Sequence, residues 1–441
     1  MSFPAYPKYK DSGVPWLGNV PTGWTVGRIK DLFEIRKRIA GELGHDVLSI
    51  TQTGLRVKDV EGNEGQQAMD YSKYQKVLPG EFAMNHMDLL TGWIDIATQA
   101  GVTSPDYRVF GARNPEAVDA DYFLRVFQMA YSARQFYPFG QGSSQLGRWR
   151  LPKDEFYAFP APIPSLDEQK QIRLFLDRET GKIDALVAAQ ERLIALLKEK
   201  RQAVISHAVT KGLDPDALMK DSGIEWLGEI PAHWDVWKLK GLTSRIGDGL
   251  HGTPEYDDDG PCYFINGTNL EDGSIRITEA TRSVSSSTAE AHRTALDHST
   301  VLISINGTIG NLALYRGETV ILGKSAAYIN CCEEIDREFL FYVLQSDSAK
   351  HSFRNTIANT TIHNLSLDAI RSLRIGLPVM SEQKQIAESM LDISTQIGDS
   401  IDEASKAIDL LKERRAALIS AAVTGKINVR GLVEQHEMEA A

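Results

Sequence analysis

The chain has 441 residues, and its 48 Lys and Arg against 59 Asp and Glu give a formal net charge of −11. With 42% hydrophobic and 8% aromatic residues, the composition is that of a globular protein with sizeable cores, which excludes a disordered or collagen-like chain. The length allows roughly three domains of ordinary size, or two domains plus connecting elements. The acidic balance argues mildly against nucleic acid as a partner, because Lys and Arg normally supply the phosphate contacts.

Cysteine usage and apolar runs bear on the cellular compartment. Cys262, Cys331 and Cys332 form no Cys-x-x-Cys pair, no zinc ligand set and no even set of disulfide partners. The first ten residues lack the apolar core of a secretory signal, and no apolar run approaches the ~18 to 20 residues needed to cross a bilayer. We therefore expect a cytoplasmic protein that does not span a membrane.

The chain carries an internal repeat. Two tryptophans, a proline and a Lys-Asp-Ser-Gly turn recur in phase in one pair of segments, and a Glu-Gln-Lys-Gln-Ile motif recurs in a second pair. A Leu-rich segment follows this motif in the same ungapped register in both copies. The matching pairs are 10–24 with 220–234, 167–172 with 381–386, and 196–210 with 410–424. Each copy therefore consists of a Trp/Pro lead-in, a middle section and a long Leu-, Ala-, Glu- and Lys-rich segment.

The middle sections, roughly 25–163 and 235–377, show no convincing residue-by-residue match. Both have a mixed α/β pattern, with Gly-, Asn- and Asp-rich turns between short apolar runs. A helix is expected late in each section, which indicates that the two inserts share a fold. A duplicated frame with divergent inserts predicts one task performed on two different targets. The expected strands are 47–51, 156–159, 300–304 and 313–315, and the expected helices are 121–130 and 337–345.

The Leu-rich segments predict two long amphipathic helices. Their apolar residues recur at spacings of three, four and seven, the pattern of a helix that pairs with another helix. At 1.5 Å per residue, the first would be on the order of 65 to 70 Å long. Because each stripe needs a partner, the simplest packing is one antiparallel pair related by a pseudo-dyad; the alternative is two core helices of separate domains. The predicted helix-pairing residues are Ile172, Leu176, Ile183, Leu193, Leu197, Val204, Ile386, Ile393, Ile397, Ile408, Leu411 and Leu418.

These segments predict a mixed α/β fold in which two globular domains are joined by two long antiparallel coiled-coil helices, with a pseudo-two-fold internal repeat. The inserts form the domains, and the helices form the frame. The expected boundaries are 1–163 for the N-terminal lead-in and first domain, 164–212 for the first long helix, 213–377 for the linker, repeated lead-in and second domain, 378–426 for the second long helix, and 427–441 for a C-terminal tail.

Motifs of catalysis and cofactor binding are missing or incomplete. The stretch from Gly317 to Ser325 has five residues between its glycines, where a phosphate-binding loop needs four. Gly140-Gln-Gly142 lacks the third glycine of a dinucleotide fingerprint. Asp257-Asp-Asp259 has no partner carboxylates at a defined spacing, and the ten histidines form no His-Glu-x-x-His pair. We expect the chain to catalyse nothing itself and to bind no cofactor or metal.

Two loop-like clusters are suited to reading DNA bases. They are dense in Arg, Gln, Asn, Ser, Thr and His, whose side chains hydrogen-bond base edges. The alternative is that such polar residues simply form turns. Lys37 and Arg38 belong to a local basic patch, which offsets the acidic net charge. The candidates from the clusters are Arg134, Gln135, Gln141, Ser143, Ser144, Gln145 and Arg148 in the first insert, and Asn359, Thr360, Thr361 and His363 in the second.

Together these features resemble the specificity subunit of type I restriction-modification systems over nearly the whole chain. The lead-ins resemble the family's entry to each target recognition domain, and Leu377-Pro378 before Glu382-Gln-Lys-Gln-Ile386 resembles its exit into a long spacer helix. Recurring recognition-domain patterns are matched by 85–87, 101–107, 248–254, 306–310 and 364–366. With the resemblance, the candidate DNA-binding residues also include His251, Thr253, Tyr256 and Asn306.

The resemblance implies a DNA sequence-recognition subunit that is not itself an enzyme. Each domain would read one half of a bipartite, asymmetric double-stranded DNA target, and the helices would fix the unread spacer. The helices would also dock two methyltransferase (modification) subunits and, in the larger complex, two restriction subunits that act as translocase and nuclease. S-adenosylmethionine, ATP and Mg2+ are expected in these partner subunits. Half-sites and spacer length stay open, because recognition depends on loop geometry and DNA shape.

Three other interpretations predict different behaviour. A type II system that uses a similar subunit would keep the fold, and the gene neighbourhood would separate it from a type I system. A two-domain coiled-coil protein-interaction scaffold would show no sequence preference on DNA. An autonomous nuclease would cut with divalent metal alone and would need paired carboxylates, which no spacing in the chain supports.

Overall fold

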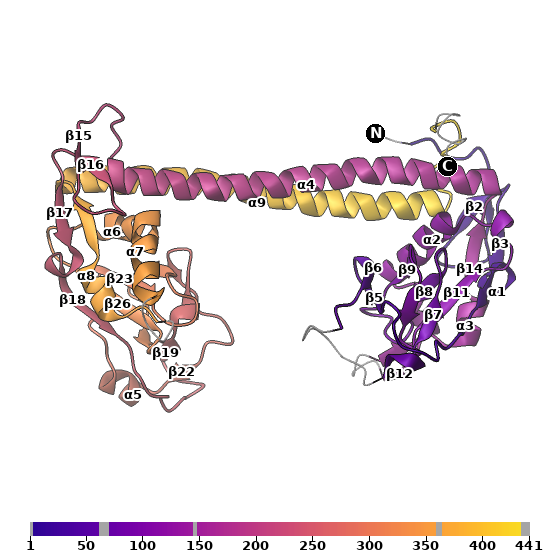
Figure 1. Ribbon diagram of the computed structural model, residues 1–441, viewed down its shortest axis with the longest axis horizontal. Helices are drawn as coiled ribbons and strands as arrows, with labels where there is room; N and C mark the ends of the chain where they lie inside the picture. The colour runs from indigo at the N-terminus through magenta and orange to yellow at the C-terminus, as the bar shows by residue number, and fades with distance from the viewer. Residues whose placement is uncertain (1–2, 61–69, 144–147, 359–363, 434–441) are drawn as a thin grey trace. The chain divides into compact units, whose positions relative to one another are not determined.

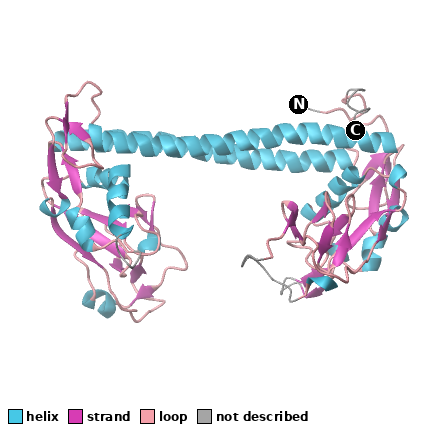
Figure 2. Cartoon of the chain, viewed as in Figure 1, coloured by secondary structure: helices cyan, strands magenta, loops and turns pink. Residues whose placement is uncertain are grey.

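The computed structural model describes residues 3–60, 70–143, 148–358 and 364–433. Two compact units make up the chain: residues 1–189 with 407–441, which we call the first unit, and residues 190–406, the second unit. Each unit mixes helices and strands (Figure 1, Figure 2). Among the described residues, every helix falls short of the apolar length that a membrane crossing requires.

Two long helices are shared between the units. α4 (Leu166–Lys211) begins in the first unit and ends in the second, whereas α9 (Met380–Val423) begins in the second and ends in the first. Gly212 and Gly425 follow the two helices with φ of +77° and +74°, a conformation that a side chain would strain. The two long helices predicted from the apolar periodicity are confirmed.

Within the first unit, the two helices pack side by side and antiparallel. Ile172 and Ile183 of α4 share a core with Leu418 of α9. Arg415 Nε lies 2.8 Å from Asp184 Oδ1, which joins the same two helices. In this unit the start of α4 lies beside the end of α9 (Figure 1). In the second unit, the end of α4 and the start of α9 likewise contribute to one core.

Most of the predicted helix-pairing residues are withdrawn from solvent, as a helix seam requires. Leu193 is the exception: it is 43% exposed, so its predicted pairing gains no support. The half-buried positions are Leu197, Val204, Ile393 and Leu411. The buried positions are Ile172, Leu176, Ile183, Ile386, Ile397, Ile408 and Leu418.

The first unit contains a four-stranded antiparallel sheet with the order β4-β11-β8-β9. A hairpin of β1 and β2 precedes it. β3 pairs with β14, the strand that leads into α4, so the insert is closed by its own first and last strands. The strands are β1 (Tyr9–Asp11), β2 (Asn19–Pro21), β3 (Thr25–Arg28), β4 (Phe33–Ile35), β8 (Phe82–Met84), β9 (Ile94–Ile96), β11 (Arg108–Ala112) and β14 (Pro160–Ile163).

The second unit repeats this arrangement. Its antiparallel sheet has the order β18-β26-β23-β24, a hairpin of β15 and β16 precedes it, and β17 pairs with β27, which precedes α9. The strands are β15 (Met219–Asp221), β16 (Glu229–Pro231), β17 (Asp235–Lys238), β18 (Thr243–Asp248), β23 (Thr300–Ser304), β24 (Leu312–Leu314), β26 (Ala326–Cys331) and β27 (Arg374–Leu377).

Both sheets follow the same path. Numbered along the chain within each sheet, the strands lie in the order first, fourth, second, third. A helix follows the last of these strands in both units: α2 (Ala120–Ser132) in the first and α6 (Arg337–Gln345) in the second. The expectation that the two inserts share a fold and carry a late helix is therefore confirmed, although their sequences do not match.

Shorter elements complete each insert. Among the described residues, the first unit adds three two-stranded ribbons and two short α-helices, and the second adds a three-stranded sheet, a small hairpin and three α-helices. In the first unit they are α1 (Ile29–Leu32), α3 (Lys153–Ala158), β5 (Leu48–Thr51), β6 (Gly54–Val57), β7 (Gln75–Val77), β10 (Gly101–Thr103), β12 (Gln141–Ser143) and β13 (Arg148–Arg150). In the second unit they are α5 (Ser286–Ala291), α7 (Asp347–Ala358), α8 (Leu367–Ser372), β19 (Cys262–Ile265), β20 (Leu270–Glu271), β21 (Ser274–Ile275), β22 (Ser283–Val284) and β25 (Val320–Leu322).

Aromatic side chains fill the core between α2 and its sheet. Phe33, Phe82 and Phe110 from three neighbouring strands meet Phe127 of α2, and the Phe82 and Phe110 rings stack with centroids 4.9 Å apart. Burial of such large side chains is a main source of stability. The core thereby fixes the sheet against α2, and the loops extend from the ends of the strands.

One expected strand is wrong. Residues 156–159 were expected to be extended, but α3 runs through most of them. Pro152 precedes the first helical residue, and Asp154 and Glu155 occupy the first turn, where carboxylates favour a helix. Phe156 and Phe159, three residues apart, are both fully buried. The aromatic run was therefore one face of a helical turn and its exit, and not a strand.

Candidate nucleic-acid interface

Several loops meet at one edge of the second unit's four-stranded sheet. β18 and β23 end at this edge and β26 begins there, because Asp248 pairs with Ala327 and Ser304 pairs with Ala326. Strand ends on one side of an antiparallel sheet place the connecting loops next to one another. We call the second-unit edge the surface formed by 249–254 after β18, 305–310 after β23, 323–325 before β26, and 364–366.

Backbone contacts tie these loops together. Leu250 forms a bridge with Gly323, and Asn306 forms a bridge with Asn364. Gly249 packs so closely that a Cβ would lie 2.1 Å from the carbonyl oxygen of the residue that ends β25, so only glycine fits there. Three patterns that are far apart in the sequence, 248–254, 306–310 and 364–366, therefore contribute to one surface.

The polar side chains of the second-unit edge come from different loops. Asn306 is half-buried, and its Nδ2 donates to the carbonyl oxygen of Lys324 at 3.2 Å. His251 is exposed, with its Nε2 2.7 Å from Asp248 Oδ2. Thr253 is exposed in the same loop. An amide, an imidazole and a hydroxyl are groups that can hydrogen-bond base edges.

Two residues show where sequence reasoning fell short at this edge. Lys324 is exposed beside Asn306, but the sequence indicated only an incomplete phosphate-binding loop there. Tyr256, a predicted DNA-binding residue, packs against Phe264 of the three-stranded sheet, and the Arg282 guanidinium lies 4.1 Å from its ring centroid. Its ring is thus engaged by its own unit.

The equivalent edge of the first unit's sheet lies where β4 and β8 end and β11 begins. Arg108, the first residue of β11, pairs with the last residue of β8. The turn after β8 is held by two other elements: the Leu151 N–H donates to the carbonyl oxygen of His86 at 2.9 Å, and the Tyr131 hydroxyl of α2 donates to that of Asn85. The end of α2 and the β12-β13 hairpin therefore join this turn in what we call the first-unit edge.

Predicted residues of the first insert collect at this edge. Arg134 and Gln135 follow the end of α2, and Arg134 is exposed with a φ of 56°. Gln141 is exposed on β12, where it pairs with Arg150 of β13. Arg150 is also exposed and was not predicted. The Arg-Trp-Arg alternation of 148–150 was the signal that could have found it, because residues two apart in a strand share a face.

Lys37 and Arg38 follow β4 and form part of a separate basic group. Arg38 forms an ion pair with Glu81, and Arg36 Nη1 lies 3.1 Å from the same carboxylate. Glu81 is only 3% exposed, so this carboxylate holds both guanidinium groups against the sheet. Lys37 between them is exposed. Arg36 Nε also lies 3.1 Å from Glu34 Oε1, so two carboxylates offset the two guanidinium groups and Lys37 adds the excess positive charge. Arg38 is not free to reorient.

The remaining predicted DNA-binding residues have no described side chain. Ser143 and Arg148 are described only as backbone of β12 and β13. The residues that lie outside the described ranges are Ser144, Gln145, Asn359, Thr360, Thr361 and His363.

A buried charge lies behind the first-unit edge. Arg108 is 5% exposed, its Nη2 donates to the carbonyl oxygen of Leu151 at 2.9 Å, and its guanidinium lies 4.7 Å from the Phe156 ring centroid. Burial lowers the pKa of Arg108 to about 10, so this side chain stays charged at neutral pH. Burial and the Arg108 charge lower the pKa of His86 to about 3, so the imidazole stays neutral. The fixed positive charge favours a phosphate-rich ligand at this edge.

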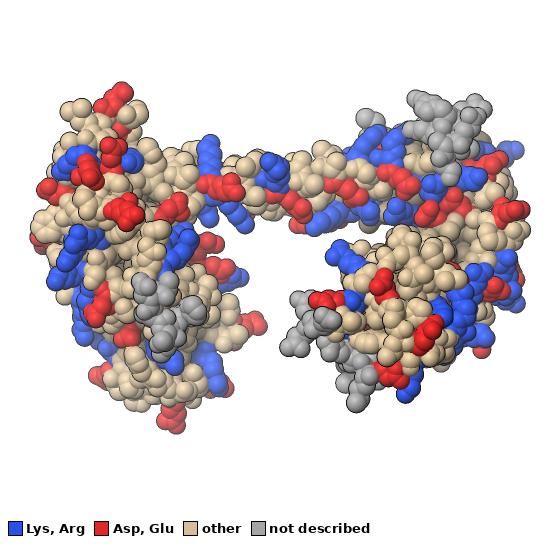
Figure 3. Space-filling model, viewed as in Figure 1, with Lys and Arg blue, Asp and Glu red and all other residues tan. Residues whose placement is uncertain are grey.

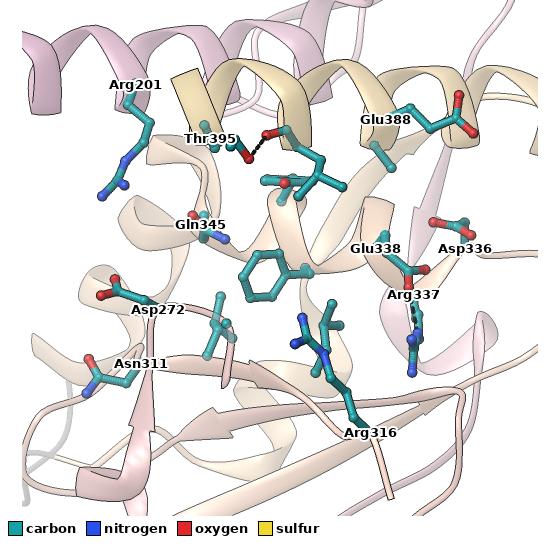
Figure 4. A pocket seen from close by; sticks show the side chains of 18 of the residues that line it. Arg201, Asp272, Asn311, Arg316, Asp336, Arg337, Glu338, Gln345, Glu388 and Thr395 are labelled. Atoms are coloured by element: carbon teal, nitrogen blue, oxygen red, sulfur yellow. Dashed lines mark hydrogen bonds and ion pairs between the residues drawn. The ribbon is translucent and has the colours of Figure 1, made fainter. Parts of the chain in front are cut away.

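A cavity of about 870 Å³ lies away from the second-unit edge, between α6, β24 and the long helices (Figure 4). Phe341 of α6 and Leu391 of α9 line it, and Arg201 of α4 and Arg316 extend toward it from opposite sides. Of the predicted DNA-binding residues that the structure describes, none lines this cavity. The cavity therefore lies beside the long helices and not at the second-unit edge.

The surface charge is mixed. Lys and Arg are interspersed with Asp and Glu on the visible face of each unit, so the net charge of −11 is not spread as a uniform acidic surface (Figure 3). Across the described ranges, no three His, Cys, Asp or Glu side chains are grouped as metal ligands would be. The arrangement at the two edges is one of hydrogen-bonding and cationic groups, which is suited to binding DNA.

Comparisons with known proteins find similarity to DNA specificity subunits. Residues 233–404 match the family model for the type I restriction modification DNA specificity domain. The chain is 23% identical to the type I restriction enzyme MjaVIII specificity subunit of Methanocaldococcus jannaschii, over 94% of this chain and 95% of that one. It is also 23% identical to the StySPI specificity subunit of Salmonella potsdam, over 63% of this chain and 59% of that one.

Solved structures share the fold. A chain from a structure of complex assembly and conformational transition in the type I R-M system aligns with a TM-score of 0.67 at 15% identity, over 92% of this chain and 99% of that one. The HsdS subunit from Thermoanaerobacter tengcongensis aligns with a TM-score of 0.52 at 14% identity, over 92% and 98%. The mixed α/β fold with two long helices is thereby confirmed. Residues 233–404 therefore match a type I restriction modification DNA specificity domain, and the chain is similar over nearly its whole length to a specificity subunit of a type I restriction enzyme.

Proposed function

We propose that the chain reads a bipartite, asymmetric DNA target in a type I restriction-modification complex, with one half-site for each unit. One observation carries this proposal: the two units repeat the same sheet, and each presents a different set of polar side chains at the same sheet edge. A repeated scaffold with two different edges suits two different half-sites. α4 and α9, as the shared frame, would fix the unread spacer. Half-sites about one helical turn apart, ~34 to 36 Å, let both edges face one side of the duplex.

The second half-site would be read from the second-unit edge. His251, Thr253 and Asn306 supply hydrogen-bonding groups, and exposed Lys324 is placed to meet a phosphate. The proposal also includes four residues that were predicted from the sequence: Asn359, Thr360, Thr361 and His363.

The first half-site would be read from the first-unit edge. Arg134, Gln135 and Gln141 supply groups that suit guanine or adenine, with Arg150 beside them. Lys37 would bind the phosphate backbone. The proposal also includes Ser143, Ser144, Gln145 and Arg148, which were predicted from the sequence.

Exposed leucines on the long helices support the docking of partner subunits. Leu196 of α4 is 50% exposed and Leu410 of α9 is 65% exposed. The two are equivalent positions of the repeat, because 196–210 matches 410–424. Large apolar side chains exposed on a helix favour burial against a partner. Equivalent positions on both helices suit two copies of one partner, which we propose to be the methyltransferase subunit.

The chemistry would reside in the partners. Methyltransferase subunits would supply S-adenosylmethionine and act on a base flipped from the duplex, while this chain, without catalysis of its own, holds the register. Two restriction subunits would use ATP and Mg2+ in the larger complex.

Co-expression of the chain with the neighbouring methyltransferase gene tests the proposal, with N6-methyladenine mapped genome-wide by long-read sequencing. The expected result is a two-part motif with a fixed gap that disappears when the chain is left out. If the two proteins associate but no sequence motif is methylated, the two-domain coiled-coil protein-interaction scaffold becomes the better interpretation.

A further inference from the structure

One buried glutamine near the start of each long helix connects the frame to the insert. Gln169 of α4 and Gln383 of α9 are the same position of the repeated Glu-Gln-Lys-Gln-Ile motif, and each is only 1% exposed. A buried side-chain amide is costly unless its donor and acceptor groups are both bonded. Both glutamines meet this requirement with matching backbone partners in the two units.

In the first unit, Gln169 holds the capping residue of α2. Its Oε1 accepts from the Asp119 N–H at 2.9 Å, and its Nε2 donates to the carbonyl oxygen of Pro164 at 3.0 Å. Asp119 caps α2, because its Oδ1 accepts from the Tyr122 N–H at 2.8 Å. Arg173, one turn further along α4, donates from Nε to Asp119 Oδ2 at 3.1 Å. The start of α2 is therefore bound to the first turns of α4.

In the second unit, Gln383 holds the capping residue of α6 in the same way. Its Oε1 accepts from the Asp336 N–H at 2.8 Å, and its Nε2 donates to the carbonyl oxygens of Pro378 at 2.9 Å and Glu334 at 3.0 Å. Asp336 caps α6 by accepting from the Phe339 N–H at 2.9 Å. Both units therefore use a glutamine at the same position of the motif, which bonds the start of the equivalent helix and the carbonyl oxygen of a proline five residues earlier.

The hydrogen bonds of each glutamine connect a long helix to the sheet whose loops form the first-unit or second-unit edge. α2 and α6 each contribute buried residues to the core beneath their sheet, and the strands of that sheet end in the loops of the edge. The inserts otherwise lack a residue match, but Asp119-Ala-Asp-Tyr and Asp336-Arg-Glu-Phe share an Asp-x-acidic-aromatic pattern. Two divergent inserts therefore keep one common attachment.

We propose that Gln169 and Gln383 are positioning residues that set the gap between the two half-sites by fixing each recognition sheet on its long helix. The inference rests on the bipartite reading proposed above. Loss of the amide frees the start of α2 or α6 to shift along the long helix, while the loops that contact bases stay intact. The gap then becomes less sharply defined, and the base preferences of both half-sites stay the same.

Methylation maps of the assembled complex test this inference with Gln383→Met and Gln169→Met, which keep the side-chain volume and remove the amide. In each variant, sites with a gap one base pair longer or shorter are expected to gain about tenfold relative to the wild-type gap, since two buried hydrogen bonds are lost in Gln169→Met and three in Gln383→Met. Both half-site sequences should be unchanged. Gln385→Met, at an exposed position of the same motif, serves as the control and should keep the wild-type gap.

Two results would overturn the inference: a gap as strict as that of the wild type in both variants, or an equal loss of methylation at all sites in an assembled complex. If Gln383→Met does not fold, Gln383→Glu, which keeps an acceptor oxygen and loses the donor, provides the same series of gaps. A wild-type complex without any two-part motif would instead contradict the proposed function, so the two failures are distinguishable.

Discussion

At the scale of single residues, burial and bonding separate groups that can read DNA from groups that build the fold. Asn306 and His251 lie at the second-unit edge, whereas Tyr256 packs against Phe264 and Arg282 within its own unit. His86 belongs to a motif that resembles a recognition-domain pattern, yet its imidazole is largely buried and neutral. Residue type alone did not distinguish these cases.

Substitution at one edge should alter one half-site only. Asn306→Ala is expected to relax base preference in the second half-site, and Gln141→Ala in the first, each by about tenfold, since a good amide-to-base contact is worth ~1 to 3 kcal/mol. Binding to duplexes with single-base changes in each half-site measures this. The two variants are reciprocal controls, and a change in the half-site assigned to the other unit would contradict the assignment.

His86 should make the first unit sensitive to acid. Its folded-state pKa of about 3 lies below the ordinary 6.5, so the unfolded chain binds the proton more readily, and stability present above pH 6.5 is lost as pH falls toward 3. Between pH 8 and pH 5, His86→Gln is expected to lose ~2 kcal/mol less stability than the wild type. Denaturant unfolding at both pH values measures the difference, and His292→Gln at an exposed position is the control.

At the scale of elements, local pattern predicted the helices well and one strand badly. α4, α9, α2 and α6 follow from apolar periodicity, because a helix places residues three and four apart on one face whatever its neighbours are. α3 did not follow, since a short aromatic run suits a strand as well as one helical turn. Its identity depended on Pro152 and on which face the core covers.

Charge on the long helices should reduce the number of bound partners. Leu196→Glu or Leu410→Glu is expected to lower the methyltransferase content of the complex from two copies to one, because burying a leucine contributes ~1.5 to 3 kcal/mol. Native mass spectrometry of the purified complex measures the stoichiometry. Lys198→Glu and Lys412→Glu, two residues away on other faces of the helices, should leave two copies bound. Two copies retained in both leucine variants would count against docking at these positions.

At the scale of the whole molecule, the repeat makes the inserts interchangeable in principle. β3 with β14 and β17 with β27 close the two inserts in the same way, and a long helix begins three residues after each closing strand ends. A chain in which 235–377 replaces 25–163 is therefore expected to methylate a motif that contains the second half-site sequence twice. A methylation map of cells that carry this chain measures the motif, and retention of the original first half-site would contradict the prediction.

The sequence by itself determined the repeat, the long helices, the late helix of each insert and the resemblance to specificity subunits, because in-phase repetition, periodicity and ordered motifs are local or additive signals. Only the tertiary structure decided which polar residues share an edge. Asn306, Asn364 and the loop after Asp248 meet because β18, β23 and β26 pair across long stretches of chain. The role of Gln169 and Gln383 was hidden for the same reason, since each bonds a capping residue about 50 positions earlier in the chain. Long-range strand pairing and buried hydrogen bonds depend on the packed core as a whole, which no local pattern encodes.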